Sequence, residues 1–221
     1  MFPIGDDNTA RRSQPVVTYA LIALNVLFFF VELSAGEPFI DRWAFIPRRF
    51  GMDPAGTIPT IFTAMFMHAG WLHLGGNMLY LWIFGDNIED RFGPVKFLIF
   101  YLACGIAATL AQYYVSPGSR IPNVGASGAI AGVLGAYLLM FPQGRVRVLF
   151  YNQIVAMPAI FVLGFWIALQ IFAGAGALFA TAQSEDVGGV AYMAHVGGFV
   201  AGLLLTFLLQ GRRPPGYGSG G

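Results

Sequence analysis

The sequence predicts an all-α membrane protein, a bundle of six transmembrane helices, and three observations predict it. Of the 221 residues, 57% are hydrophobic and 10% are charged, whereas an ordinary soluble domain carries about a quarter charged residues. The charges gather between six long apolar stretches. The 29 glycines suit helices that pack closely in lipid, because small residues let two backbones approach each other.

The six apolar stretches give the predicted helices in order along the chain. They are approximately residues 16–33, 71–85, 95–115, 124–141, 154–182 and 187–209. A bilayer core needs about 20 mostly apolar residues at about 1.5 Å each, and four of the stretches reach or approach that length. The second is short unless it continues to about Ile88, and the fifth is long enough to tilt.

The first stretch has an alternative interpretation as a signal peptide, because Arg11 and Arg12 precede it. We favour a retained span, since the stretch lacks an A-x-A cleavage site and ends at Glu32.

The cations predict an orientation. If the N-terminus is cytoplasmic, eight of the twelve Lys and Arg residues lie on the inner side, namely Arg11, Arg12, Arg91, Lys96, Arg145, Arg147, Arg212 and Arg213. This distribution obeys the positive-inside rule, and an even number of spans then puts both termini in the cytoplasm. We therefore expect a multi-pass protein of the plasma membrane.

The expected organisation has three parts. Residues 1–14 are a cytoplasmic N-terminal segment, residues 15–210 are the six-helix membrane domain, and residues 211–221 are a flexible cytoplasmic tail. The long loop 35–70 mixes aromatic and apolar residues with Arg and Pro, so we expect it to lie in the outer membrane interface.

Composition and motifs also exclude several functions. A net charge of +1 leaves no strong field for nucleic acid, so no nucleic-acid partner is expected. The single cysteine, Cys104, indicates neither redox chemistry nor a thiolate metal cluster. The chain has no H-E-x-x-H motif and no pair of intramembrane aspartates, which argues against zinc and aspartyl proteases. We expect no metal and no cofactor.

Four polar residues inside apolar stretches carry the functional prediction: His73, Asn77, Ser127 and His195. Burying such groups without partners costs several kcal/mol, so their presence in a span needs a reason. In the predicted orientation all four lie in the outer third of the bilayer, although they come from three different helices.

Ser127 lies in Gly125-Ala126-Ser127-Gly128 at the start of a predicted helix. The glycines leave the hydroxyl open and let a substrate backbone come close. A backbone N–H at a helix N-terminus is also a ready donor to developing negative charge. The alternative is that Ser127 is one more small packing residue, in a face with Gly128, Gly132 and Gly135. The serine alone does not decide between a nucleophile and a packing residue.

His195 shares one side of the sixth stretch with Gly198 and Gly202. GxxxG pairs, Gly128/Gly132 and Gly198/Gly202, let the fourth and sixth stretches approach and bring an imidazole to the serine hydroxyl. A neutral imidazole takes a serine proton and returns it to a leaving amine. No acidic residue is placed to orient it, so we expect a pair rather than a triad. The alternative is a histidine bonded to a buried carbonyl.

His73 and Asn77 are four residues apart and therefore face the same way on the second stretch. Two side-chain donors on one face are what an oxyanion hole needs. His68 lies five residues before His73, and we expect it to brace the loop rather than to touch substrate.

These motifs resemble those of a known family. His73-Leu74-Gly75-Gly76-Asn77 resembles H-x-x-x-N, Gly125-Ala126-Ser127-Gly128 resembles G-x-S-G, and Ala194-His195-Val196-Gly197-Gly198 resembles A-H-x-x-G of the rhomboid intramembrane serine proteases. The resemblance covers approximately residues 60–202. It implies the rhomboid six-helix fold with a water-filled cavity that opens outward, Ser127 as nucleophile and His195 as general base. It also implies that His73, Asn77 and the Ser127 amide bind the oxyanion.

The resemblance further implies the substrates: single-span membrane proteins in the lipid bilayer, cut near the outer face and usually at a small residue. A peptide bond locked in a helix in lipid cannot present its carbonyl, so the substrate must unwind. Lateral access near the second and fifth spans, with residues 183–186 as a cap, is also implied. One departure is Ala131, where some members carry an aromatic residue that stacks under the histidine.

Two other functions compete with a protease. A catalytically inactive relative that binds membrane proteins as a chaperone typically lacks the serine or the histidine, and both are present here. A channel or transporter needs a polar path across the whole bilayer, and the inner two thirds of the stretches show no such line of polar residues. The sequence therefore favours an enzyme.

Overall fold

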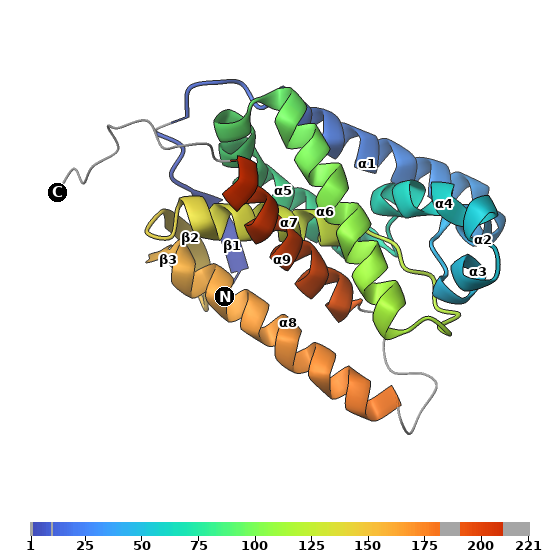
Figure 1. The fold of residues 1–221 in the computed structure, drawn as a ribbon. Helices are drawn as coiled ribbons and strands as arrows, with labels where there is room; N and C mark the ends of the chain where they lie inside the picture. The colour runs from blue at the N-terminus through green and yellow to red at the C-terminus, as the bar shows by residue number, and fades with distance from the viewer. Residues whose placement is uncertain (1, 10, 182–190, 210–221) are drawn as a thin grey trace.

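Six long helices make up most of the described chain, and a small sheet lies at one end of them (Figure 1). The computed structural model describes residues 2–9, 11–181 and 191–209. The long helices are α1 (Val16–Ala35), α5 (Trp71–Phe92), α6 (Pro94–Val115), α7 (Ser127–Met140), α8 (Ala159–Thr181) and α9 (Tyr192–Leu209).

Each predicted apolar stretch corresponds to one of these helices, but they are not all equally suited to cross a membrane. By length and composition, four candidate spans occur among the described residues: α1, α6, α8 over Ala159–Gly176, and α9. Helix α7 is apolar but shorter. Helix α5 is 22 residues long, and its last two turns carry several charged side chains.

Two predicted boundaries were wrong. The fifth stretch was expected to be helical from residue 154, but Gln153–Pro158 is strand β3, and α8 begins at Ala159. The second stretch continues as a helix to Phe92, well beyond residue 85. Residues 182–190, which include the predicted cap, and the predicted tail 211–221 lie outside the described residues.

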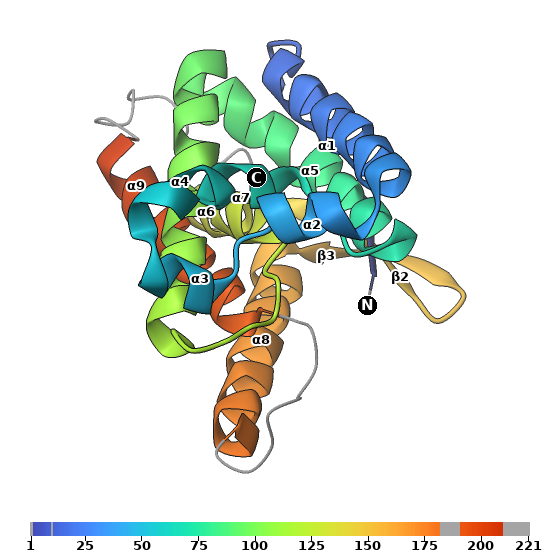
Figure 2. The ribbon, with the colours of Figure 1, turned by 90° about the vertical axis from the view of Figure 1, so that its right-hand side faces the viewer.

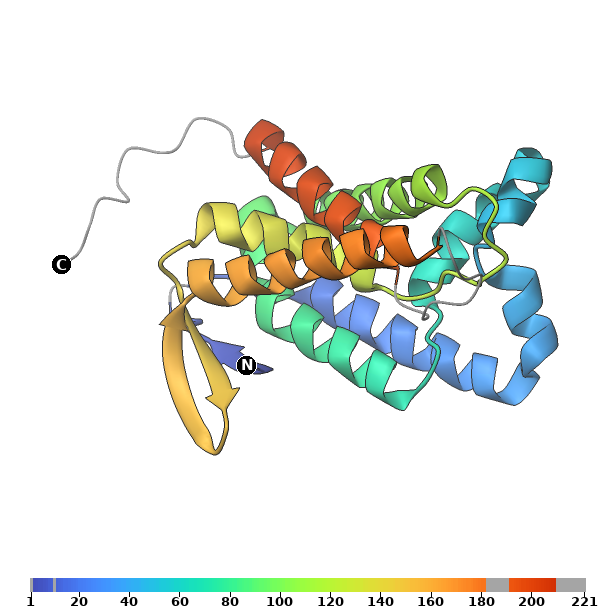
Figure 3. The same ribbon diagram turned by 90° about the horizontal axis from the view of Figure 1, so that it is seen from below.

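A three-stranded antiparallel sheet was not predicted. Strands β1 (Phe2–Asp6), β2 (Arg145–Phe150) and β3 pair in that order, with Phe2 opposite Leu149 and Val146 opposite Met157. Figure 3 shows the β2–β3 hairpin projecting from one end of the bundle with β1 beside it. The N-terminal segment therefore pairs with the chain between α7 and α8.

The predicted loop 35–70 consists mostly of short helices. They are α2 (Glu37–Trp43), α3 (Pro47–Met52), α4 (Pro54–Thr63) and a 3-10 turn, η1 (Ala64–Phe66). A proline stands in the first turn of each of the three α-helices, where its missing N–H costs no hydrogen bond. These helices gather at the end of the bundle opposite the sheet (Figures 1 and 2).

Helix α7 is the centre of the fold. Every residue from Gly128 to Tyr137 is buried, and α5, α6 and α9 pack around it. A helix that is apolar on all sides is one that other helices surround. Burial on every side explains why this helix needs no polar face, although its 14 residues make it the shortest of the long helices.

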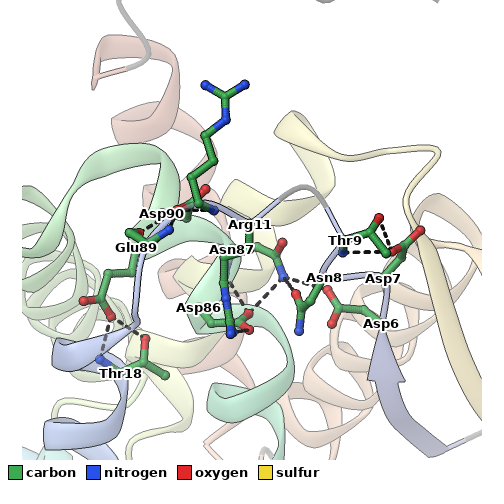
Figure 4. A network of polar contacts seen from close by, with 12 residues as sticks. Asp6, Asp7, Asn8, Thr9, Arg11, Thr18, Asp86, Asn87, Glu89 and Asp90 are labelled. Carbon is green, nitrogen blue, oxygen red and sulfur yellow. Dashed lines mark hydrogen bonds and ion pairs between the residues drawn. The ribbon is translucent and has the colours of Figure 1, made fainter. Parts of the chain in front are cut away.

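The last turns of α5 organise the sheet end through hydrogen bonds (Figure 4). The carboxylate of Glu89, which is 1% exposed, accepts hydrogen bonds from the backbone N–H of Val17 at 2.9 Å and of Thr18 at 2.7 Å, and from the Thr18 hydroxyl at 2.8 Å. The first N–H groups of a helix have no partner inside it. Glu89 therefore caps the N-terminus of α1.

Hydrogen bonds to Asp6 hold β1 against two helices, α5 and α7. The carboxylate of Asp6 accepts hydrogen bonds from Asn87 Nδ2 at 2.7 Å and from the Tyr137 hydroxyl at 2.8 Å. Beside it, Arg11 donates to Asp86 at 2.7 Å. Burial raises the pKa of Asp6 from 3.8 to about 7.

We expect the protein to be less stable at higher pH because of Asp6. The unfolded chain releases this proton near pH 3.8, whereas the folded chain keeps it until about pH 7. The resulting stability is fully present below the lower pKa and is lost as pH rises through the higher one. The melting temperature in detergent should therefore fall by a few degrees between about pH 5 and about pH 8, and Asp6→Asn should flatten this fall.

The matched control is Asp41→Asn, since Asp41 is an exposed aspartate on α2, at the opposite end of the bundle from Asp6. Its melting temperature should follow that of the wild type at each pH. Equal pH dependence in wild type and Asp6→Asn contradicts the assignment of this proton to Asp6.

Candidate active site

Ser127 and His195 lie within hydrogen-bond distance of each other. Ser127 is the first residue of α7, His195 is in the first turn of α9, and Ser127 Oγ is 2.8 Å from His195 Nε2. The two residues are 68 positions apart in the chain. Their proximity is the arrangement that the sequence predicted for them.

Backbone contact between α7 and α9 brings these two side chains together. A Cβ atom added at Gly198 meets the carbonyl oxygen of Gly128, and one added at Gly202 meets the carbonyl oxygen of Gly132. Gly128 itself has no room on its other side, where an added Cβ lies 2.5 Å from Ala108 Cβ. The predicted GxxxG pairs therefore form the helix contact, and any larger side chain separates the helices.

His73 and Ser127 border the same small space beside Gly125. The Gly125 φ of +129° lies in the region that favours glycine. A Cβ added there lies 2.8 Å from His73 Nε2 and 3.5 Å from Ser127 Oγ. The ring nitrogen and the hydroxyl therefore border the space that a side chain at position 125 would fill.

A hydrogen bond to His73 Nδ1 determines which of the two ring nitrogens carries the hydrogen. His73 Nδ1 accepts a hydrogen bond from the N–H of Ala69 at 3.4 Å. In a neutral ring one nitrogen accepts and the other carries the hydrogen. The Nε2–H of His73 is thus a donor that points toward the space beside Ser127.

Asn77 and His68 are both buried close to His73. Asn77 is one helical turn further along α5 and 8% exposed, and its Nδ2 has no hydrogen-bond partner among the described residues. His68 is 1% exposed, and its ring stands edge-on to His73 at 5.2 Å between centroids. The backbone N–H of His68 donates to Glu32 Oε2 at 3.0 Å. Both ring nitrogens of His68 are buried without a hydrogen-bond partner among the described residues, and the expected bracing role of His68 stays a prediction.

The loop before Ser127 is fixed by the region of the short helices. The N–H of Asn123 donates to the carbonyl of Phe45 at 2.7 Å, and the N–H of Gly125 donates to the carbonyl of Ala64 at 2.8 Å. Ala126, the N-cap of α7, makes no side-chain cap hydrogen bond. The Ser127 N–H lies in the first turn, where N–H groups lack intrahelical partners.

Two residues next to His195 were missed by the sequence analysis. Gln170 Oε1 is 2.7 Å from His195 Nδ1, and the ring centroid of Trp166 is 5.9 Å from that of His195. Both residues are on α8. A glutamine inside an apolar stretch was a visible signal by the criterion that selected His73, Asn77 and Ser127.

The comparison with known proteins decides the family. The model of the rhomboid domain matches residues 55–212. The chain belongs to the rhomboid family. With its four candidate spans, this rhomboid is a multi-pass membrane protein, and the matched range contains every candidate site residue described above.

Several relatives carry protease names. Rhomboid protease GluP of Bacillus subtilis is 33% identical over 204 residues, which are 90% of this chain and 36% of GluP. The putative rhomboid protease YdcA of the same organism is 30% identical over 209 residues, 95% of this chain and 96% of YdcA. Mitochondrial rhomboid protein 1 of Saccharomyces cerevisiae is 30% identical over 199 residues, 88% of this chain and 53% of that protein.

We expect Gly198→Ala to destabilise the rhomboid bundle. The added methyl group meets the Gly128 carbonyl, and overpacking of this kind costs about 1–3 kcal/mol. The measurement is the melting temperature in detergent. The control is Gly164→Ala on α8, where an added Cβ meets nothing within 4 Å; a Gly198→Ala variant as stable as this control contradicts the close helix contact.

Proposed function

We propose that this rhomboid is an intramembrane serine endopeptidase that cleaves membrane proteins with Ser127 and His195. The observation that carries the proposal is the 2.8 Å distance between Ser127 Oγ and His195 Nε2. A serine hydroxyl is a weak nucleophile until an adjacent base accepts its proton. The imidazole stands where such a base is needed.

The proposed reaction proceeds through an acyl-enzyme. Ser127 Oγ attacks the substrate carbonyl carbon while its proton passes to His195 Nε2, which gives a tetrahedral intermediate and an imidazolium. His195 then returns the proton to the amide nitrogen, the C–N bond breaks and the amine leaves. Water, deprotonated by His195, hydrolyses the ester and restores the serine hydroxyl.

Three donors are proposed to stabilise the oxyanion. They are His73 Nε2–H, Asn77 Nδ2 and the backbone N–H of Ser127. For His73, the supporting observation is that its Nε2 borders the same space as the serine hydroxyl. For Asn77, it is that Nδ2 is buried without a hydrogen-bond partner among the described residues. Donors fixed in a dry site stabilise developing charge more strongly than donors in water.

The site favours a small substrate side chain. A cavity beside Ser127, with a lining that includes Gly105, Ala108, Gly128 and Ala194, has a volume of only about 20 Å³, little more than a single water molecule needs. We propose that it receives a small residue at the cleavage site of a single-span membrane protein. The scissile segment must be unwound before Ser127 reaches its carbonyl, because a helix in lipid keeps its carbonyls bonded.

The proposed topology completes the function. We propose six spans, with α5 and α7 joining the four candidates, in the plasma membrane, with the termini in the cytoplasm and the site toward the outer face. The cations at the sheet end of the bundle support this direction. Arg11, Arg145 and Arg147 lie at the sheet end, and cations favour the cytoplasmic side.

Ser127→Ala and His195→Ala should each abolish cleavage of a co-expressed transmembrane substrate, because each removes one partner of the proposed proton transfer. A fluorophosphonate probe should label the wild type at Ser127 and neither variant. Both variants should keep the wild-type melting temperature to within a few degrees. Equal labelling of wild type and Ser127→Ala rules out the mechanism, whereas an unlabelled wild type is the result expected of an inactive rhomboid relative.

Asn77→Ala should lower kcat about 10²- to 10³-fold, as the loss of one oxyanion donor does, while KM stays near the wild-type value. The comparison is Met78→Leu on the same helix, a volume-conserving change that should leave both constants unchanged. A wild-type kcat in Asn77→Ala removes this residue from the oxyanion site. Steady-state cleavage of a model substrate in detergent or liposomes gives both constants.

A further inference from the structure

We propose that Gln170 on α8 is a positioning residue that holds His195 in the tautomer and orientation required for proton transfer. The proposal rests on the proposed function of Ser127 and His195. It assigns to a neutral amide on a different helix the orienting task that a carboxylate performs in a serine-protease triad.

The hydrogen bonds on both sides of the imidazole determine the tautomer. Gln170 Oε1, a carbonyl oxygen that can only accept, is 2.7 Å from His195 Nδ1. Nδ1 must therefore carry the hydrogen and donate it. In the neutral ring Nε2 is then the acceptor, and it faces the Ser127 hydroxyl at 2.8 Å. The opposite tautomer loses the bond to Gln170 and leaves no lone pair for the serine proton.

A second contact from the same helix supports the assignment. Trp166 is four residues before Gln170, so the two side chains lie on one face of α8. The Trp166 ring is tilted by 37° against the imidazole with centroids 5.9 Å apart. On the α7 side, position 131 is a buried alanine and offers no ring. Helix α8 therefore supplies both described contacts that orient the imidazole without reacting.

The close approach of α8 to α9 continues beyond this pair. A Cβ added at Gly174 lies 3.1 Å from Tyr192 Cβ and also meets the end of the Met193 side chain. Figures 1 and 2 show α8 along the outside of the bundle. The orientation of His195 thus depends on a helix that is itself at the edge of the fold.

A neutral amide also suits the apolar surroundings of His195 better than a carboxylate does. An isolated carboxylate in an apolar site pays a large desolvation penalty, whereas an amide fixes the tautomer without a buried charge. Gln170 orients the base, and the proposed oxyanion donors separately stabilise the negative charge that develops on the substrate oxygen. The consequence is a defect confined to the chemical step when the amide is removed.

The test compares Gln170→Leu with Gln170→Glu in the full-length protein. Gln170→Leu removes the acceptor and should lower kcat about 10- to 100-fold, a part of the roughly 10²- to 10⁴-fold that a positioned general base contributes. KM should stay unchanged. Gln170→Glu keeps an acceptor oxygen in either protonation state and should recover most of the loss. Gln170→Met is a second variant without the carbonyl acceptor if leucine impairs folding, since its thioether sulfur accepts only weakly.

The matched control is Phe172→Leu, since Phe172 is on the same helix and 76% exposed; its kinetics should equal those of the wild type. Imidazole ¹⁵N NMR reports the tautomer directly. The hydrogen of His195 should be on Nδ1 in the wild type and distributed over both nitrogens in Gln170→Leu and Gln170→Met.

Two results overturn the proposal: wild-type kcat in both Gln170→Leu and Gln170→Met, or a fall in kcat with the hydrogen still on Nδ1. Either result leaves the proposed protease intact as long as Ser127→Ala is inactive. Cleavage by Ser127→Ala instead overturns the proposed function itself, so the two failures are distinguishable.

Discussion

The backbone contact between α7 and α9 is the constraint on which the rest of the structure depends. Between helices in lipid there is little hydrophobic driving force, so association comes from close packing and hydrogen bonds. The glycines remove the side chains that would separate the two helices. The serine at the start of one helix then reaches a histidine 68 positions away without any loop having to bring it there.

The central position of α7 follows from the same constraint. A helix that offers bare backbone on one side and mostly apolar side chains elsewhere has little surface suited to lipid headgroups or water, and α5, α6 and α9 cover it. Its N-terminus is held by backbone hydrogen bonds from Asn123 and Gly125 to the short-helix region. The nucleophile candidate therefore stands on the most constrained helix, and its partner is oriented from α8, one of the least constrained.

Much of the candidate site could be predicted because its signals are local. Small residues at helical spacing predicted the α7–α9 contact, and polar residues inside apolar stretches selected Ser127, His195, His73 and Asn77. Gln170 gave the same kind of signal and was overlooked because no motif drew attention to it.

The parts that escaped prediction depend on distant partners. The alternation Arg145-Val146-Arg147-Val148 is typical of a strand, and both valines are buried, but it lay beside an apolar stretch that was assigned to a helix. Strand β1 gave no local signal at all. Its buried Asp6 bonds to Tyr137, 131 positions away, and no pattern in five residues reveals such a partner.

The Glu89 cap of α1 has a consequence for the order of assembly. The amides that it satisfies belong to Val17 and Thr18, which are synthesised 72 and 71 residues earlier. When α1 first leaves the ribosome and enters the membrane, its leading N–H groups have only water or lipid headgroups as partners. They gain their permanent acceptor only after α5 has been made and has packed against α1. The capping of α1 is therefore completed only after Glu89 has been synthesised, when α5 packs against α1.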